Sequence, residues 1–92
     1  MSSVKNHKVI KDWFMYVVEC ADGTYYTGIT TDLQRRLHEH NHSGRGAKYT
    51  RSRRPVDLIF WECHANRSLV SKAEARFKKL SRSQKRDYID RD

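Results

Sequence analysis

The sequence predicts an α+β domain with the element order β-β-α-β-α-α, in which a small three-stranded antiparallel sheet is flanked by helices. Two observations lead to this prediction. Three short runs are rich in aromatic and β-branched residues, whereas three other stretches carry apolar residues at helical spacing. The lone proline, Pro55, and all four glycines lie in turns or turn-like positions.

The 92 residues are enough for one small domain with a modest core. Residues 1–12 are mostly polar and show no clean period, so we expect a flexible N-terminal tail and a single domain over residues 13–92. Two cysteines, Cys20 and Cys63, are too few for a disulfide scaffold. Because we find neither a signal peptide nor an apolar run near membrane-spanning length, we expect reduced thiols, a cytoplasmic or nucleoid-associated location and no membrane partner.

Residues 13–20, WFMYVVEC, and residues 24–29, TYYTGI, predict two strands joined as a hairpin. Between them lies the sequence ADG. It fits either a two-residue turn of Asp22 and Gly23 or a three-residue loop in which Gly23 takes the left-handed position.

The length of this loop decides where the side chains of Tyr16 and Tyr26 point. A two-residue turn sends them to opposite faces, because a shift of one residue in register moves every side chain to the other face. A three-residue loop pairs Val18 with Tyr26 and Tyr16 with Gly28, so that both tyrosines share one face. The hairpin residues by themselves permit both arrangements.

Residues 30–41, TTDLQRRLHEHN, predict a helix that starts with a capping box of Thr31 and Gln34. Arg35 and Glu39 are expected to point away from its buried face. The positions that follow one another at i, i+3, i+4 and i+7 along that face are Leu33, Arg36, Leu37 and His40.

Residues 42–55, HSGRGAKYTRSRRP, predict a loop with two glycines, five lysines or arginines and no acid. Residues 56–63, VDLIFWEC, predict a third strand that is apolar enough to be central in a small sheet. Two more helices are expected over residues 66–80 and 81–89, and the second starts with a capping box at Ser81.

Glu74 is expected on the inward side of the helix over residues 66–80. It is the only carboxylate between Arg67 and Arg86, a span with eight lysines and arginines. An ionised carboxylate beside a core is costly unless it is paired or bound to a metal. The ordinary explanation of Glu74 is therefore an ion pair with Arg36.

Four inward-leaning polar side chains thus come from four different elements, namely Tyr16, Tyr26, Arg36 and Glu74, and His40 is a fifth, on the same helix as Arg36. Each has an ordinary explanation, because a strand tyrosine usually packs with its hydroxyl at the rim and an arginine extends its head to water. The net charge of +8 and the pI of about 9.8 favour a polyanionic partner, and nucleic acid is the first candidate.

The segments MYV and YTG, whose tyrosines are ten residues apart, resemble the two signature halves of the GIY-YIG nucleases. Arg36 follows Tyr26 by ten residues, as the family's arginine does. Phe14 and Met15 replace the first glycine and isoleucine, and Ile89 lies close to a position where many members carry an asparagine. The stretches YYTGITTDLQRRLHEHN, GRGAKYTRSRRP and RFKKLSRSQK are similar to small stand-alone members, and the resemblance covers roughly residues 13–89.

The resemblance implies a GIY-YIG-like fold and a metal-dependent endonuclease that hydrolyses DNA phosphodiester bonds, with structure-selective cleavage linked to repair or recombination. It implies Mg²⁺, or another divalent cation, held by Glu74, and Arg36 on the scissile phosphate. Tyr16 would orient or deprotonate the attacking water, Tyr26 would hold a second phenol in the same network, and His40 would assist proton transfer or orient phosphate. Because both tyrosines would serve one site, the resemblance favours the three-residue loop.

Backbone phosphates of DNA, with RNA as the alternative, are expected to contact the basic loop and the helix that carries Glu74. Lys78 and Lys79 extend this track. Two other interpretations stay open: a non-catalytic nucleic-acid-binding module, and a repair-complex subunit that is active only with a protein partner. We expect a monomer or a weak dimer. The residues expected to bind nucleic acid are Lys48, Tyr49, Arg51, Arg53, Arg54 and Lys72.

Overall fold

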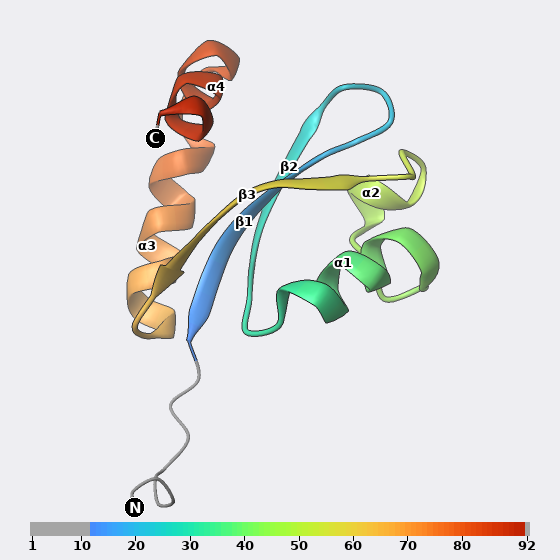
Figure 1. Ribbon diagram of the computed structural model, residues 1–92, viewed down its shortest axis with the longest axis horizontal. Coiled ribbons are helices and arrows are strands. Elements are labelled where there is room, and N and C mark those ends of the chain that lie inside the picture. The colour runs from blue at the N-terminus through green and yellow to red at the C-terminus, as the bar shows by residue number, and fades with distance from the viewer. Residues whose placement is uncertain (1–11, 92) are drawn as a thin grey trace, which may run out of the picture.

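The computed structural model describes residues 12–91, so most of the predicted tail over residues 1–12 lies outside the described residues. The sheet has the strand order β2-β1-β3 with antiparallel neighbours, which confirms the predicted α+β architecture (Figure 1). No helix between residues 12 and 91 is long and apolar enough to cross a membrane. The elements are β1 (Trp13–Glu19), β2 (Tyr25–Thr30), α1 (Leu33–His42), α2 (Lys48–Arg51), β3 (Asp57–His64), α3 (Arg67–Lys78) and α4 (Arg82–Asp90).

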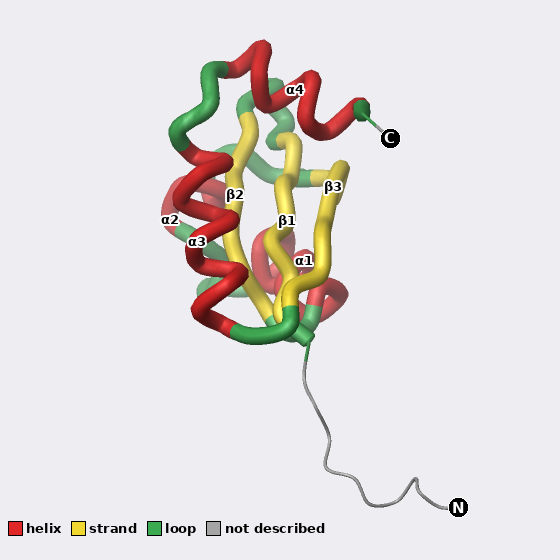
Figure 2. The backbone as a smooth tube through the Cα atoms, turned by 90° about the vertical axis from the view of Figure 1, so that its left-hand side faces the viewer, coloured by secondary structure: helices red, strands yellow, loops and turns green. Residues whose placement is uncertain are grey.

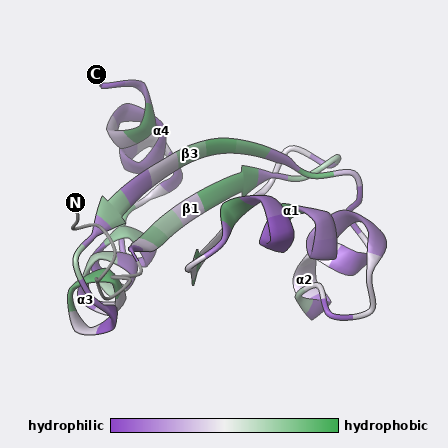
Figure 3. Cartoon of the chain, turned by 60° about the horizontal axis from the view of Figure 1, so that its bottom comes forward, coloured by the Kyte–Doolittle hydropathy of each residue, from purple (hydrophilic) through white to green (hydrophobic). Residues whose placement is uncertain are grey.

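Helices cover both faces of the sheet, with α3 and α4 on one side and α1 and α2 on the other (Figure 2). The alternation of side chains along β1 feeds two separate cores. One core joins Met15 and Val17 to Phe77 of α3. The other core packs Tyr16 and Val18 against Leu33 and Leu37 of α1. Strands β1 and β3 are largely hydrophobic and α1 is largely hydrophilic (Figure 3), so the sheet supplies most of the apolar surface on the α1 side.

The hairpin has the three-residue loop. The Cys20 N–H donates to the Thr24 carbonyl at 2.8 Å, and Gly23 has a φ of +85°, which is the left-handed region that favours glycine. In this register Tyr16 lies opposite Gly28 and Val18 opposite Tyr26. The two tyrosines therefore share the face that α1 covers.

Gly28 is the position at which the ring of Tyr16 lies across β2. A Cβ atom at Gly28 would lie 2.6 Å from the Tyr16 hydroxyl oxygen and 2.8 Å from its Cζ. No side chain fits into this space without moving the tyrosine, so the glycine of the YTG segment keeps the phenol in its position.

Strand β3 was predicted to be central, and this prediction was wrong, because β1 lies in the middle of the sheet and β3 at an edge. The prediction failed because an apolar run on both faces of a strand is typical of a central strand. In β3 this run is only partly buried, and Trp61 remains 55% exposed. The continuous burial of residues 15–18 in β1 is the feature typical of a central strand.

Three local predictions also need correction or confirmation. Helix α1 begins at Leu33 and is capped by Asp32, whose carboxylate accepts from the Arg35 N–H at 3.0 Å, so the predicted capping box at Thr31 is wrong. The predicted loop over residues 42–55 contains the one-turn helix α2. The capping box at Ser81 is confirmed.

Replacing Gly28 with alanine tests the close packing of Tyr16 on β2. We expect the free energy of unfolding to fall by about 1–3 kcal/mol, because the new methyl group and the phenol cannot share the same space. Urea denaturation monitored by circular dichroism measures this change. Gly44→Ala is the matched control, because a Cβ atom there meets nothing within 4 Å. Equal losses in the two variants would contradict the packing described here.

Candidate active site

Three rings meet on the face of the sheet beneath α1. Tyr16 of β1 and Tyr26 of β2 both contact the imidazole of His40, with ring centroids 5.8 Å and 5.3 Å away. The Tyr16 hydroxyl lies 2.7 Å from His40 Nε2. His40 is fully buried and Tyr16 is 2% exposed, so this hydrogen bond is closed off from water. The sequence placed His40 beside a stripe of leucines, and the structure makes it the centre of the cluster.

A chain of hydrogen bonds fixes the proton positions on His40. Its Nδ1 lies 2.8 Å from Thr50 Oγ1, and the single hydroxyl proton of Thr50 is donated to the Ala47 carbonyl at 2.9 Å. Thr50 therefore accepts from His40, which requires the proton on Nδ1. The bare Nε2 is left to accept from the Tyr16 hydroxyl.

Burial shifts the two partners in opposite directions, because it disfavours the charged form of each. It raises the pKa of Tyr16 to about 12, and the Arg36 guanidinium opposes this rise. It lowers the pKa of His40 to about 4, and the positive charge of Arg36 adds to this effect. Both groups are thus neutral over the physiological pH range.

Arg36 lies at the edge of this cluster with 24% of its side chain exposed. Its Nη1 donates to Glu39 Oε1 at 2.8 Å and to the Arg45 carbonyl at 2.9 Å. Glu39 was expected to point away from the buried face, but its side chain is only 17% exposed because it pairs with Arg36. The ion pair holds the guanidinium next to Tyr16, while 24% of the Arg36 side chain as a whole remains exposed.

Glu74 lies on α3, on the other face of the sheet. Its carboxylate pairs with Lys78 at 3.2 Å and its side chain is 22% exposed, so the alternative of an Arg36–Glu74 ion pair is wrong. It is still near enough to Tyr16 for its negative charge to raise the pKa of the phenol, although burial is the main cause. Glu74 is thus half-buried and electrostatically coupled to the tyrosine.

A metal at this place would depend on Glu74. Within residues 12–91, no group of three or more His, Cys, Asp or Glu side chains is placed to share a metal ion. A single half-buried carboxylate fits a hard cation such as Mg²⁺, which keeps several of its waters, and does not fit a cation that needs a full set of protein ligands.

The predicted nucleic-acid residues fall into two groups. Lys48, Arg51 and Lys72 are exposed, as a phosphate contact requires. Arg53 instead pairs with the Asp22 carboxylate at 3.0 Å, and its guanidinium lies 3.9 Å from the centroid of the Tyr49 ring. The Tyr49 ring in turn stacks on Tyr26 at 6.0 Å. Arg53 and Tyr49 therefore connect the basic segment to the site.

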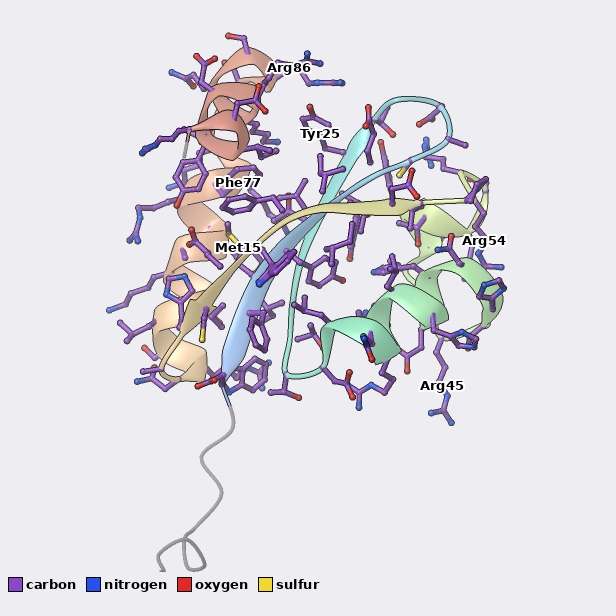
Figure 4. All side chains as sticks on the ribbon, in the orientation of Figure 1. Met15, Tyr25, Arg45, Arg54, Phe77 and Arg86 are labelled. Carbon is purple, nitrogen blue, oxygen red and sulfur yellow. The ribbon has the colours of Figure 1, made fainter. Side chains whose placement is uncertain are left out.

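The Arg54 side chain, labelled beside α1 and α2 in Figure 4, forms hydrogen bonds with the protein backbone and is therefore not a free phosphate contact. Its guanidinium donates to the carbonyls of His40, Ser43 and Glu39 at the end of α1, where the Glu39 and Ser43 carbonyls also accept from the Ser43 and Gly46 N–H groups. Asn41 adds two bonds to the backbone of Val56, at 2.7 Å and 3.0 Å. These contacts fix the last turn of α1 and with it the position of His40.

Sequence reasoning missed Thr50 and Asn41. Thr50 lies in a segment that has no apolar period, since a helix of one turn is too short to produce one. The sequence around the buried Thr50 and the half-buried Asn41 gave no signal that their side chains bond inward. Their partners, His40 and Val56, are ten and fifteen residues away.

Comparison with known proteins finds one matching family model and several similar proteins. A model of the GIY-YIG catalytic domain matches residues 12–87. A UPF0213 protein of Desulfotalea psychrophila is 56% identical over 77 residues, which is 84% of this chain and 70% of the relative. A UPF0213 protein of Streptococcus agalactiae is 53% identical over 76 residues, covering 83% of this chain and 85% of the relative.

Two structures solved by NMR are also similar. The E. faecalis protein EF2693 is 53% identical and superposes with a TM-score of 0.62, over 86% of this chain and 83% of the other. The UPF0213 protein BH0048 of Bacillus halodurans is 40% identical with a TM-score of 0.56, over 85% and 82% of the two chains.

The neutral state of His40 makes stability depend on pH. Its pKa of about 4 in the fold lies below the ordinary value of about 6.5, so the unfolded chain binds more protons between these values. The stabilisation is complete above pH 6.5, and about 3 kcal/mol is lost as the pH falls to 4. NMR of the imidazole nitrogens measures the titration directly and should show the proton on Nδ1. A His40 that titrates near pH 6.5 would contradict this prediction.

Arg54→Ala should lower the free energy of unfolding by about 1–3 kcal/mol, because three carbonyls at the end of α1 lose a charged donor. Thermal and urea denaturation measure the loss. Arg51→Ala, in the same basic segment but exposed, is the control and should change stability by less than about 0.5 kcal/mol. If the two variants were equally stable, Arg54 would be a surface residue in solution.

Proposed function

The chain belongs to the GIY-YIG catalytic domain family, a nuclease superfamily, and we propose that it is a metal-dependent endonuclease that hydrolyses DNA phosphodiester bonds. The observation that carries this proposal is the buried Tyr16–His40–Thr50 chain beside the partly exposed side chain of Arg36. A fold that needed only stability would gain nothing from enclosing a phenol, an imidazole and a cation together.

Arg36 supplies the contact to the scissile phosphate. Its guanidinium is permanently charged and presents a planar fork that matches two phosphate oxygens. One of its nitrogens is engaged by Glu39 and the Arg45 carbonyl, which orients the side chain in advance. The remaining N–H groups are free to bind the phosphate as charge develops on it.

Tyr16 acts on the attacking water. In the resting protein burial raises the pKa of Tyr16 to about 12 and lowers the pKa of His40 to about 4, so moving the proton from the phenol to the imidazole is unfavourable. Tyr16 is therefore a neutral, buried phenol at rest, and it would orient the attacking water through its oxygen only after the bound substrate brings that water to it. It becomes a base, with His40 Nε2 receiving its proton, only when added positive charge lowers the cost of this proton transfer.

The group that adds this charge is a divalent cation, Mg²⁺ or a similar ion, which nucleases of this superfamily generally use. Glu74 would hold it, and the ion would stabilise the charge on the phosphoryl oxygens and on the departing oxygen. Lys78 now pairs with Glu74 and has to release it, which frees an ammonium group for the substrate.

We expect the protein to select DNA by the three-dimensional structure of the DNA and not by its base sequence. Phosphate contacts from exposed residues such as Lys48, Arg51 and Lys72 give affinity without reading bases. We therefore propose branched or damaged DNA as the substrate, in repair or recombination, with the protein in the cytoplasm or at the nucleoid.

The test is cleavage of branched, nicked and linear DNA with Mg²⁺ or with EDTA. We expect nicking of the branched or nicked substrates that needs Mg²⁺ and is lost in Glu74→Ala. Asp87→Ala, which removes an exposed carboxylate of α4, is the control and should cleave normally. Bound but uncut DNA would favour a non-catalytic module, and cleavage only after addition of cell extract would favour a partner-dependent subunit.

A second arm of the same assay tests the tyrosine. Tyr16→Phe should cleave about 100-fold more slowly or worse, because the group that orients water is gone. Tyr88→Phe is matched to it, since the Tyr88 hydroxyl also makes a single 2.7 Å hydrogen bond, to Glu62 on the other side of the molecule. Its cleavage rate should stay at the level of the unmodified protein.

A further inference from the structure

We propose that a groove across the outer edge of β2 is a subsite for one unpaired nucleotide next to the cleavage point, with Lys85 holding its phosphate. This inference rests on the proposed action on nucleic acid and names the part of the substrate that the site selects. It also assigns a role to α4, which the proposed cleavage chemistry does not use.

The groove has a volume of about 250 Å³ and joins both faces of the sheet. Tyr26 and Tyr49 come from the α1 side, whereas Tyr25 and Thr27 belong to the α3 side. Strand β2 is an edge strand, so alternate backbone N–H groups along it have no partner strand in the described sheet. The residues that line the groove are Tyr25, Tyr26, Thr27, Tyr49, Lys78 and Lys85.

Both charged groups in the lining are lysines, so the groove fits an anion. Lys85 is half-buried, and among residues 12–91 no carboxylate pairs with it. Its ammonium lies 5.8 Å from the centroid of the Phe77 ring. A partly desolvated ammonium against an aromatic ring gains from an incoming phosphate, because little water has to be displaced. Lys78 is occupied by Glu74 and becomes available only when that pair opens.

The groove is continuous with the active site through Tyr26. One part of this tyrosine lines the groove, and its ring lies 5.3 Å from the ring of His40. Tyr49, which is 38% exposed, stacks on Tyr26 with 23° between the planes. A strand that places its scissile phosphate at Arg36 and Tyr16 would therefore continue into the groove.

The aromatic lining decides the chemical class of the ligand. Three tyrosines give the groove an aromatic lining, and Tyr25 lies between β2 and α4 with the Arg82 guanidinium 4.1 Å from its centroid (Figure 4). Bases reach such rings only when they are unpaired, since a base pair in a duplex is stacked on both sides. The groove therefore selects a single-stranded segment beside the cleaved bond.

The test is an NMR titration of ¹⁵N-labelled protein with a 5′-phosphorylated thymidine trinucleotide, without divalent cations so that nothing is cleaved. We expect the amide signals of Tyr25, Tyr26, Thr27 and Lys85 to shift. Lys85→Ala should bind about tenfold more weakly with a smaller salt dependence, whereas Lys85→Arg should retain binding. Arg86→Ala removes an exposed cation of α4 outside the groove and should bind normally.

Shifts confined to other surfaces, equal affinities of Lys85→Ala and Arg86→Ala, or equal binding of a short duplex in the groove would each overturn the inference. Because the titration measures binding without cleavage, a protein that fails to cut DNA but binds the trinucleotide at Lys85 would refute the nuclease proposal alone. Unchanged thermal denaturation of Lys85→Ala shows that its loss of binding is not a loss of fold.

Discussion

The hydrogen bond between the Tyr16 hydroxyl and His40 Nε2 is the interaction on which the arrangement of the site depends. It joins the central strand to α1, and the surrounding structure serves to keep its two ends in place. Gly28 leaves room for the phenol, Thr50 fixes the proton of the imidazole, and Arg54 and Asn41 fasten the turn that carries His40. A buried polar pair of this kind is stabilising only when each further donor and acceptor has a partner.

The same burial that protects this pair also keeps it inactive at rest. A phenol that holds its proton tightly and an imidazole that rejects one cannot exchange it on their own. Burial is the main cause of the raised pKa of Tyr16; Arg36 opposes it and the negative charge of Glu74 adds a smaller rise. A positive charge added beside Glu74 would counter the effect of Glu74 on the phenol. The chemistry is thus coupled to the arrival of metal and substrate rather than being available in the free protein.

The fold and much of the site could be predicted from the sequence because they depend on short spacings. The hairpin residues permitted two registers, and the resemblance of MYV and YTG to the GIY-YIG halves favoured the one that the structure has; helical spacing placed Arg36 and His40 together. The rest depends on long-range contacts. Neither the edge position of β3 nor the inward bonds of Arg54 leave a local period, and a basic segment with an internal role has the same composition as one that binds phosphate.

Strand β3, at the opposite edge from the groove, contains Asp57 and Glu62, and no lysine or arginine occurs from residue 56 to residue 66. The positive charge of the chain is therefore distributed unevenly across the sheet, which gives the molecule a permanent electric dipole directed from one edge to the other. In the field of a polyanion this dipole exerts a torque before contact. Productive collisions would then be favoured over random ones, and the advantage would shrink as added salt shortens the screening length.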